Sequence, residues 1–179
     1  QLFGVGVHLG GQKGTAAGTL RMLEDLRASS FRDDVYWRLV EPRKGEFFWP
    51  RSLAELDRLV EWSVQPGIVP LLILDYDNAV HFTGLPVEES KVEAFRRYAE
   101  NVAKRFVGKV SLFELWNEWN LWKDIKDPTE SARAYARLLS AVAPTVRAAN
   151  PQARVICGAV ANRDELWIEA FVADPAAGM

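Results

Sequence analysis

The sequence predicts an α/β fold in which five β-strands alternate with five helices along a single domain of residues 1–179. Two observations lead to this prediction. Short apolar runs rich in β-branched residues recur along the chain, and each is followed by a stretch with one apolar stripe at helical spacing. Repeated strand–helix units of this kind form a parallel sheet covered by helices.

The apolar runs predict strands at residues 3–9, 31–37, 68–74, 110–116 and 154–160. Several of them are apolar almost without interruption, which is typical of parallel strands buried on both faces. The order of the runs along the chain gives five consecutive βα units with no linker and no low-complexity tract between them.

The intervening stretches predict helices at residues 16–28, 53–64 and 165–173, and two longer helices with stripes between residues 92 and 106 and between 132 and 146. Stop signals follow three of them, at Pro66-Gly67, Gly108 and Asn150-Pro151. Thr129 or Ser131 is expected to cap the helix around residues 132–146.

Composition excludes several function classes. The formal net charge is -2 and no basic run is interleaved with aromatic residues, so we expect no nucleic-acid partner. No apolar run approaches the ~20 residues of a membrane span. Cys157 is the only cysteine and is expected to be a buried, inert thiol. His8 and His81 are the only histidines and lie far apart in sequence, so we expect no metal and no other cofactor.

Two architectures fit five βα units, a partial (β/α)8 barrel and an open doubly wound sheet. A complete barrel typically has ~250 residues, and five units in this length project to about that size if three more follow. An open nucleotide-binding sheet would need a phosphate-binding first turn. Gly4, Gly6 and Gly10 are spaced one residue too long for the dinucleotide pattern, and Gln12 stands where the Walker motif requires lysine. Neither phosphate-binding motif is therefore complete in this sequence.

Polar and aromatic residues gather where the predicted strands end. His8 ends the first, Asp75 and Tyr76 follow the third, and Asn117-Glu118 follows the fourth between tryptophans. A carboxylic acid beside an amide suits glycoside chemistry, because the acid protonates the leaving oxygen while the amide bonds a hydroxyl of the reacting sugar. The alternative is that the pair only caps a strand, but its position between Trp116, Trp119 and Trp122 favours function.

These segments resemble the large clan of retaining (β/α)8 glycosidases known as clan A. Trp116-Asn117-Glu118 is similar to the clan's acid/base signature, and residues 31–37, 40–49 and 70–76 resemble the second and third strand regions of family 39 enzymes. The greatest likeness is to family 39 members that act on bacterial exopolysaccharides. The resemblance covers essentially the whole chain and matches the N-terminal portion of the barrel.

The resemblance implies roles for six residues. Glu118 would be the general acid/base and Asn117 the partner of the sugar 2-hydroxyl. Arg32 would place a charge near the reaction centre in support of the nucleophile. The cleft would be lined in part by Trp37, Tyr76 and Trp122. Trp119 stands where the family usually has proline, a change expected to alter the loop rather than the chemistry.

The family nucleophile, a second glutamate at the end of the seventh strand, has no counterpart in these residues. Retaining hydrolysis needs two carboxyl groups ~5 Å apart. By strand alternation Glu114 shares a face with Glu118 but lies four residues away, or ~13 Å. Asp75 is nearer, but the family has no nucleophile there. We therefore expect the 179-residue chain alone to be inactive or nearly so.

The resemblance implies an oligosaccharide or polysaccharide substrate, and favours a secreted or periplasmic location for the parent enzyme. The alternative function is a non-catalytic carbohydrate-binding half-barrel, which would bind sugars through the aromatic cleft without turnover. An incomplete barrel has unpaired first and last strands, so self-association through these edges is also expected.

Overall fold

The computed structural model describes residues 3–178 and contains five parallel strands in one sheet. The strands are β1 (Gly4–Gly6), β2 (Ser30–Tyr36), β3 (Val69–Asp75), β4 (Leu112–Leu115) and β5 (Arg154–Cys157). The principal helices are α1 (Ala16–Asp25), α3 (Ala54–Ser63), α4 (Glu89–Arg105), α5 (Pro128–Ala149) and α6 (Glu165–Ala173). Shorter elements are α2 (Trp37–Val40) and the 3₁₀ turns η1 (Arg51–Leu53), η2 (Trp119–Leu121) and η3 (Pro175–Ala177).

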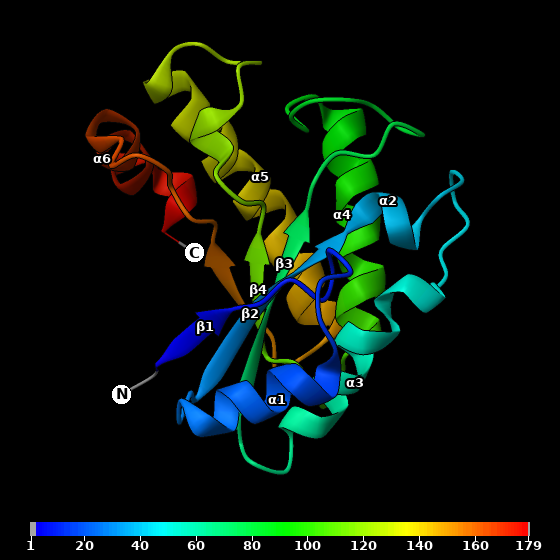
Figure 1. The fold of residues 1–179 in the computed structure, drawn as a ribbon. Coiled ribbons are helices and arrows are strands. Elements are labelled where there is room, and N and C mark those ends of the chain that lie inside the picture. The colour runs from blue at the N-terminus through cyan, green and yellow to red at the C-terminus, as the bar shows by residue number, and fades with distance from the viewer. Residues whose placement is uncertain (1–2, 179) are drawn as a thin grey trace.

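Strand order decides between the two architectures. The sheet order is β1-β2-β3-β4-β5, so each strand lies beside its neighbour in sequence. A doubly wound sheet would reverse its strand order at a switch point, and no reversal occurs among these strands. In Figure 1 helices α1, α3, α4 and α5 follow one another around the outside of the sheet. The fold is therefore an α/β partial (β/α)8 barrel of five βα units, as predicted.

Helix boundaries follow local capping. Thr15 caps α1 by accepting a hydrogen bond from the Gly18 N–H at 3.2 Å. The predicted caps of α5 were wrong, because Asp127 accepts from the Glu130 N–H at 2.8 Å and Pro128 occupies the first turn. Ser131 instead lies inside α5, where it accepts a hydrogen bond from the indole of Trp167. This bond attaches α6 to α5.

The hydrophobic core lies between the outer face of the sheet and the helices. Phe31, Leu72 and Phe113 point from the middle strands into it and are at most 1% exposed. Tyr98 on α4 and Tyr135 on α5 donate their hydroxyls to strand carbonyls, the latter to Leu115 at 2.6 Å. These bonds fix the two longest helices at the carboxyl ends of β2 to β4, the region of the candidate site.

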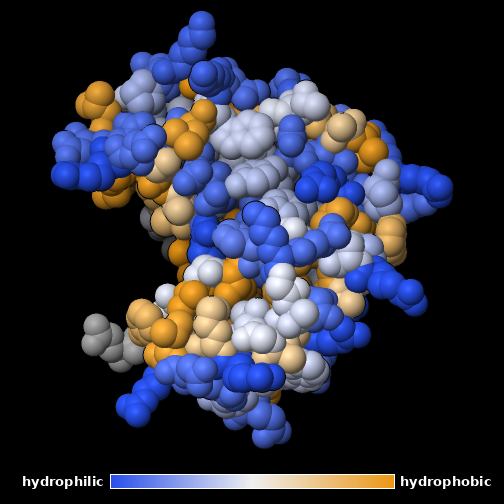
Figure 2. Space-filling view, viewed as in Figure 1, coloured by the Kyte–Doolittle hydropathy of each residue, from blue (hydrophilic) through white to orange (hydrophobic). Residues whose placement is uncertain are grey.

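The edge strands leave part of the inner face uncovered. In the part of the chain that the structure describes, β1 pairs only with β2, and β5 pairs only with β4. Cys157 on β5 is exposed, which corrects the expectation of a buried thiol, because no further strand covers it among residues 3–178. The space-filling view in Figure 2 is hollowed between the region of α6 and that of β1 and α1, and apolar residues border the hollow.

Candidate active site

Strand register brings the inward-facing polar residues into two rows. Paired residues of neighbouring parallel strands face the same side of the sheet. Asp34 on β2 aligns with Ile73 on β3, which aligns with Glu114 on β4. One step nearer the carboxyl end, Tyr36 aligns with Asp75. Active sites of parallel barrels lie at this end, so the register assembles a polar floor beneath the strand-end loops.

The backbone after β4 turns sharply and presents Glu118 to solvent. Strand β4 ends at Leu115, and both Trp116 and Glu118 adopt left-handed φ angles of 62° and 51°. The Glu118 N–H donates to the Ala159 carbonyl after β5 at 2.9 Å, which holds the turn. Non-glycine residues in this conformation are strained and concentrate at functional sites. Glu118 is exposed, although it lies directly beside buried Trp119.

The turn also ends the strand alternation assumed from the sequence. Trp116 is fully buried and packs against Phe95 of α4, at 5.6 Å between ring centroids. Glu114 points the other way, to Arg32 on the inner face. Glu114 and Trp116 therefore do not share a face, because the left-handed residue rotates the chain away from the regular strand.

An open pocket lies beside Glu118. Trp122 is partly buried, and its ring lies 5.8 Å from Tyr76 and 5.2 Å from Trp116. Flat apolar rings of this kind can pack on the apolar face of a sugar. The pocket is lined by Tyr76, Asn117, Glu118, Leu121, Trp122 and Lys123. The structure thus brings four of the six predicted site residues, namely Tyr76, Asn117, Glu118 and Trp122, to one opening.

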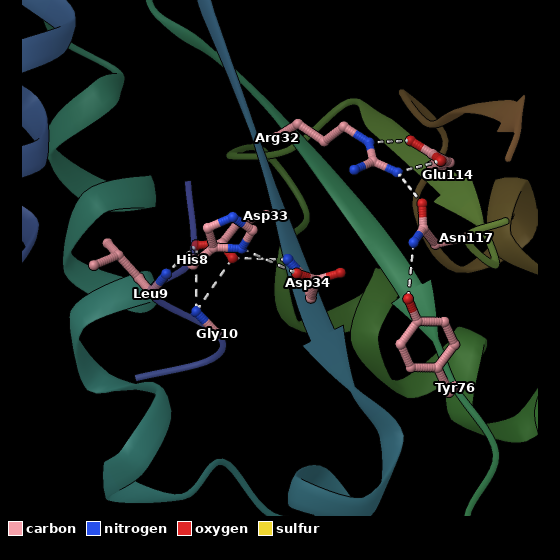
Figure 3. Close-up of polar contacts among 9 residues, drawn as sticks. All are labelled: His8, Leu9, Gly10, Arg32, Asp33, Asp34, Tyr76, Glu114 and Asn117. Atoms are coloured by element: carbon pink, nitrogen blue, oxygen red, sulfur yellow. Dashed lines mark hydrogen bonds and ion pairs between the residues drawn. The ribbon is translucent and has the colours of Figure 1, made fainter. Parts of the chain in front are cut away.

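Arg32 lies deeper along the strands than this opening, away from their carboxyl ends, and connects to it through a hydrogen-bond network (Figure 3). Its Nε and Nη2 donate to the two carboxylate oxygens of Glu114 at 2.7 Å each. Nη2 also donates to Asn117 Oδ1 at 2.8 Å, and Asn117 Nδ2 donates to the Tyr76 hydroxyl at 2.8 Å. The Glu114 hydrogen bond raises the pKa of Arg32 above its usual value, and burial raises the pKa of Tyr76.

Sequence reasoning missed Glu114 as the partner of Arg32. The two side chains are 82 residues apart in sequence, and only the register across β2, β3 and β4 shows that they meet. The available signal was that Glu114 is the one charged residue in an otherwise apolar strand, and that Arg32 is the one basic residue in its own strand. A charge on the inner face of such a strand needs a partner of opposite sign.

Two further carboxyl groups are buried, that of Asp33 on β2 and that of Asp75 at the end of β3. Asp33 accepts hydrogen bonds from the N–H groups of Leu9 at 2.9 Å and Gly10 at 3.2 Å, which attaches the first loop to β2 (Figure 3). Burial outweighs these bonds and raises the pKa of Asp33 to about 6. Asp75 is 0% exposed and neither of its carboxyl oxygens has a hydrogen-bond partner. Burial, with the charge of Asp34, raises the pKa of Asp75 well above its usual value.

Trp37 does not line this opening, which corrects the prediction made for it. The chain turns into α2 directly after β2, so Trp37 points into the core and is 0% exposed. Its ring stacks on Tyr98 at 5.3 Å, and its Nε1 donates to buried Glu41 at 2.5 Å. The preceding residue, Tyr36, lies on the inner face instead, 6.1 Å from the ring of Tyr76.

Residues 3–178 contain neither a candidate metal site nor a candidate membrane span. No group of three or more His, Cys, Asp or Glu side chains in this part of the chain is arranged to hold a metal ion. None of its helices is both long and apolar enough to span a membrane.

Comparison with known proteins places the chain in a family. The model of the cellulase family, glycosyl hydrolase family 5, matches residues 1–175. The chain belongs to this family. A search of curated proteins gave no match.

Three of the solved structures similar to this family 5 chain are named as enzymes that act on glycosides. A family 39 glycoside hydrolase from the gut symbiont Bacteroides cellulosilyticus WH2 has 29% sequence identity and a TM-score of 0.69, over 87% of this chain and 31% of that one. Endo-glycoceramidase II from Rhodococcus sp. has 19% identity and a TM-score of 0.71, over 90% and 50%. The β-glucosidase from Thermotoga maritima has 16% identity and a TM-score of 0.61, over 78% and 36%.

The similarity to a family 39 enzyme agrees with the resemblance inferred from the strand motifs. The family model that matches the chain is that of family 5. The chain spans from 31% to 50% of the length of these three structures. The two structures below 20% identity show the barrel fold only.

Proposed function

We propose that this chain supplies the acid/base side of the active site of a retaining glycosidase, with Glu118 as the general acid/base. The proposal depends mainly on the conformation of Glu118. This carboxyl is exposed at the end of β4, on a left-handed turn, beside an amide and an aromatic wall. A general acid must reach the leaving oxygen in this way, and barrel enzymes place it at this end of the strands.

The neighbouring side chains support this assignment. Asn117 lines the pocket and bonds the hydroxyl of the reacting sugar next to the anomeric carbon. Trp122 and Tyr76 form the wall on which a sugar ring packs. Arg32 acts from beneath the pocket through its bond to Asn117. In this proposal the substrate is an oligosaccharide or polysaccharide, consistent with the glycosidase names of the similar structures.

The nucleophile in this proposal is a second glutamate outside residues 1–179 of the complete enzyme. On the inner face of the sheet, the carboxylate of Glu114 is bound to Arg32 and that of Asp75 is fully buried, so neither is free to act as the nucleophile. The second glutamate attacks the anomeric carbon and forms an ester while Glu118 gives its proton to the leaving oxygen. Glu118 then takes a proton from the water that hydrolyses the ester, which restores both groups.

A second candidate function is carbohydrate binding without catalysis. It is favoured by the aromatic-lined pocket, because Glu118 is the one carboxylate among the residues that line it. Under this alternative the sugar binds, and the charge state of Glu118 matters only for affinity.

Turnover of cellotetraose by the complete enzyme that carries this chain separates the two functions. Glu118→Gln is compared with Glu61→Gln, which changes a carboxylate on α3 that pairs with Lys109 just before β4, at the end of the sheet opposite the pocket. We expect Glu118→Gln to lower kcat/KM by about 10²- to 10⁴-fold, the usual contribution of a general acid, and Glu61→Gln to leave it unchanged. Cellotetraose binding without turnover in the unsubstituted enzyme would favour the binding function. The isolated 179-residue chain is expected to show no turnover.

A further inference from the structure

Glu114 lies beneath the pocket and is held by three donors. It is 4% exposed as a residue, although its side chain is ionisable. Its two oxygens accept from Arg32 Nε and Nη2 at 2.7 Å, and Oε1 also accepts from the Ala159 N–H at 2.9 Å. These bonds connect β4 to β2 and to the segment after β5. A bidentate pair of this kind fixes the plane of the guanidinium.

The fixed guanidinium determines which way the amide of Asn117 faces. Arg32 has only donors, so the atom of Asn117 that lies 2.8 Å from Nη2 has to be the acceptor, Oδ1. The amide nitrogen then faces the other way and donates one N–H to the Tyr76 hydroxyl at 2.8 Å. Its second N–H has no partner in this network. Because Asn117 lines the pocket, that N–H is available to a bound sugar.

We propose that Glu114 is a positioning residue, which acts through Arg32 to hold the Asn117 amide with its N–H, rather than its carbonyl, towards the sugar. The sugar contact rests on the proposed function, whereas the orientation of the amide does not. A reversed amide would set Asn117 Nδ2 against the Arg32 Nη2 donor and offer a carbonyl to the sugar. The network excludes that orientation as long as Arg32 is held in place.

Glu114→Gln removes the negative charge and one of the two acceptor oxygens of this side chain, while the shape of the side chain stays nearly the same. A glutamine carbonyl can accept from Arg32 Nε, but its NH₂ group would then confront the Nη2 donor. The guanidinium would lose one of its two parallel bonds, and Asn117 would lose its fixed partner. The matched control is Glu41→Gln, which changes another buried glutamate that bonds Trp37 and Gly45 and has no contact with Arg32 or Asn117.

The experiment measures the side-chain N–H signals of Arg32 and Asn117 by ¹H–¹⁵N NMR in the 179-residue chain. In the unsubstituted protein we expect separate signals for the two Asn117 amide protons and a slowly exchanging Arg32 Nε–H. In Glu114→Gln both should shift and exchange about tenfold faster, the effect expected from losing one hydrogen bond. In Glu41→Gln they should stay unchanged. Unchanged Asn117 and Arg32 signals in Glu114→Gln would overturn the proposal.

Arg32→Lys provides a second variant if Glu114→Gln does not fold. A lysine keeps the positive charge but has no fork to bond both Glu114 oxygens and Asn117 together. It should release Asn117 in the same way, and an unchanged Asn117 amide would again overturn the proposal.

A kinetic experiment tests the same role in the complete enzyme. It compares kcat and KM on two aryl glycosides, one with the 2-hydroxyl and one without it. Glu114→Gln should lower kcat more than it changes KM on the hydroxylated substrate, and should have a smaller effect on the 2-deoxy substrate. An equal loss on both substrates would contradict the proposed role of the amide. If Glu118→Gln leaves turnover unchanged, the proposed function fails, while the NMR result still decides whether Glu114 orients Asn117.

Discussion

The buried carboxyl group of Asp75, at the end of β3, allows the free-energy cost of burying an ionisable group near the candidate site to be measured. Its carboxyl is completely buried, and neither oxygen accepts a hydrogen bond. Burial is the main cause that raises its pKa well above 3.8, and the neighbouring Asp34 charge adds to it. Asp75→Asn keeps the shape of the side chain and removes its ability to ionise.

The sign of the effect follows from the raised pKa. The folded state favours the protonated acid, so the contribution of Asp75 to stability is fully present below pH 3.8 and is lost as the pH rises through the folded pKa. Asparagine cannot ionise, so the variant keeps the stability that the natural protein loses. The variant has no ionisation penalty, so we expect its free energy of unfolding at pH 8 to exceed that of the natural protein by about 1.4 kcal/mol for each pH unit by which the folded pKa of Asp75 lies above 3.8. The melting temperature would rise by about 2–4 °C per kcal/mol.

The assay is urea unfolding followed by tryptophan fluorescence at pH 4, 6 and 8. At pH 4 the two proteins should have nearly equal free energies of unfolding, and the difference should grow with pH. Asp25→Asn, which changes an exposed carboxylate at the end of α1, serves as the control and should show no such trend. A variant that is destabilised at pH 8, or that differs equally at every pH, would refute the reasoning.

Three further predictions follow from the same structure. Because burial raises the pKa of Asp33 to about 6, the contribution of Asp33 to stability should fall by about 2 kcal/mol between pH 4 and pH 6.5, and urea titrations of Asp33→Asn should lack this step. Trp37→Ala should lower the free energy of unfolding by about 3–5 kcal/mol, whereas Trp122→Ala should mainly weaken cellotetraose binding in calorimetry; the reverse pattern would contradict the placement of the two rings. The unpaired edges of β1 and β5 should cause concentration-dependent self-association in sedimentation velocity, and a monomer at all concentrations would count against it.

The fold was predictable because parallel βα units have a clear pattern. Apolar runs such as residues 68–74 differ from the strand Val69–Asp75 by one residue at each end, and helix α6 matches its predicted bounds. The first strand was predicted too long, since β1 spans only Gly4–Gly6. The loop that follows contains glycines, including Gly10, whose place leaves no room for a side chain beside the Asp34 carbonyl.

The candidate site was predictable where one segment contains it, as with Asn117 and Glu118. It was not predictable where tertiary contacts decide. Trp37 is buried because α2 begins directly after β2. The residues of this segment do not predict that bend. Glu114 meets Arg32 only through the register of three strands. Cys157 is exposed because the burial of a residue on an edge strand depends on which elements pack against that strand. The apolar sequence of the strand does not determine it.

The role of Glu118 as the acid/base of a retaining enzyme is tested most directly by azide rescue of Glu118→Ala in the complete enzyme that carries this chain. The substrate is a 2,4-dinitrophenyl glycoside, whose leaving group needs little protonation, so the covalent ester still forms and then accumulates. We predict that azide accelerates turnover and gives a glycosyl azide with the anomeric configuration of the substrate. No acceleration by azide, or a product of inverted configuration, would contradict the assignment.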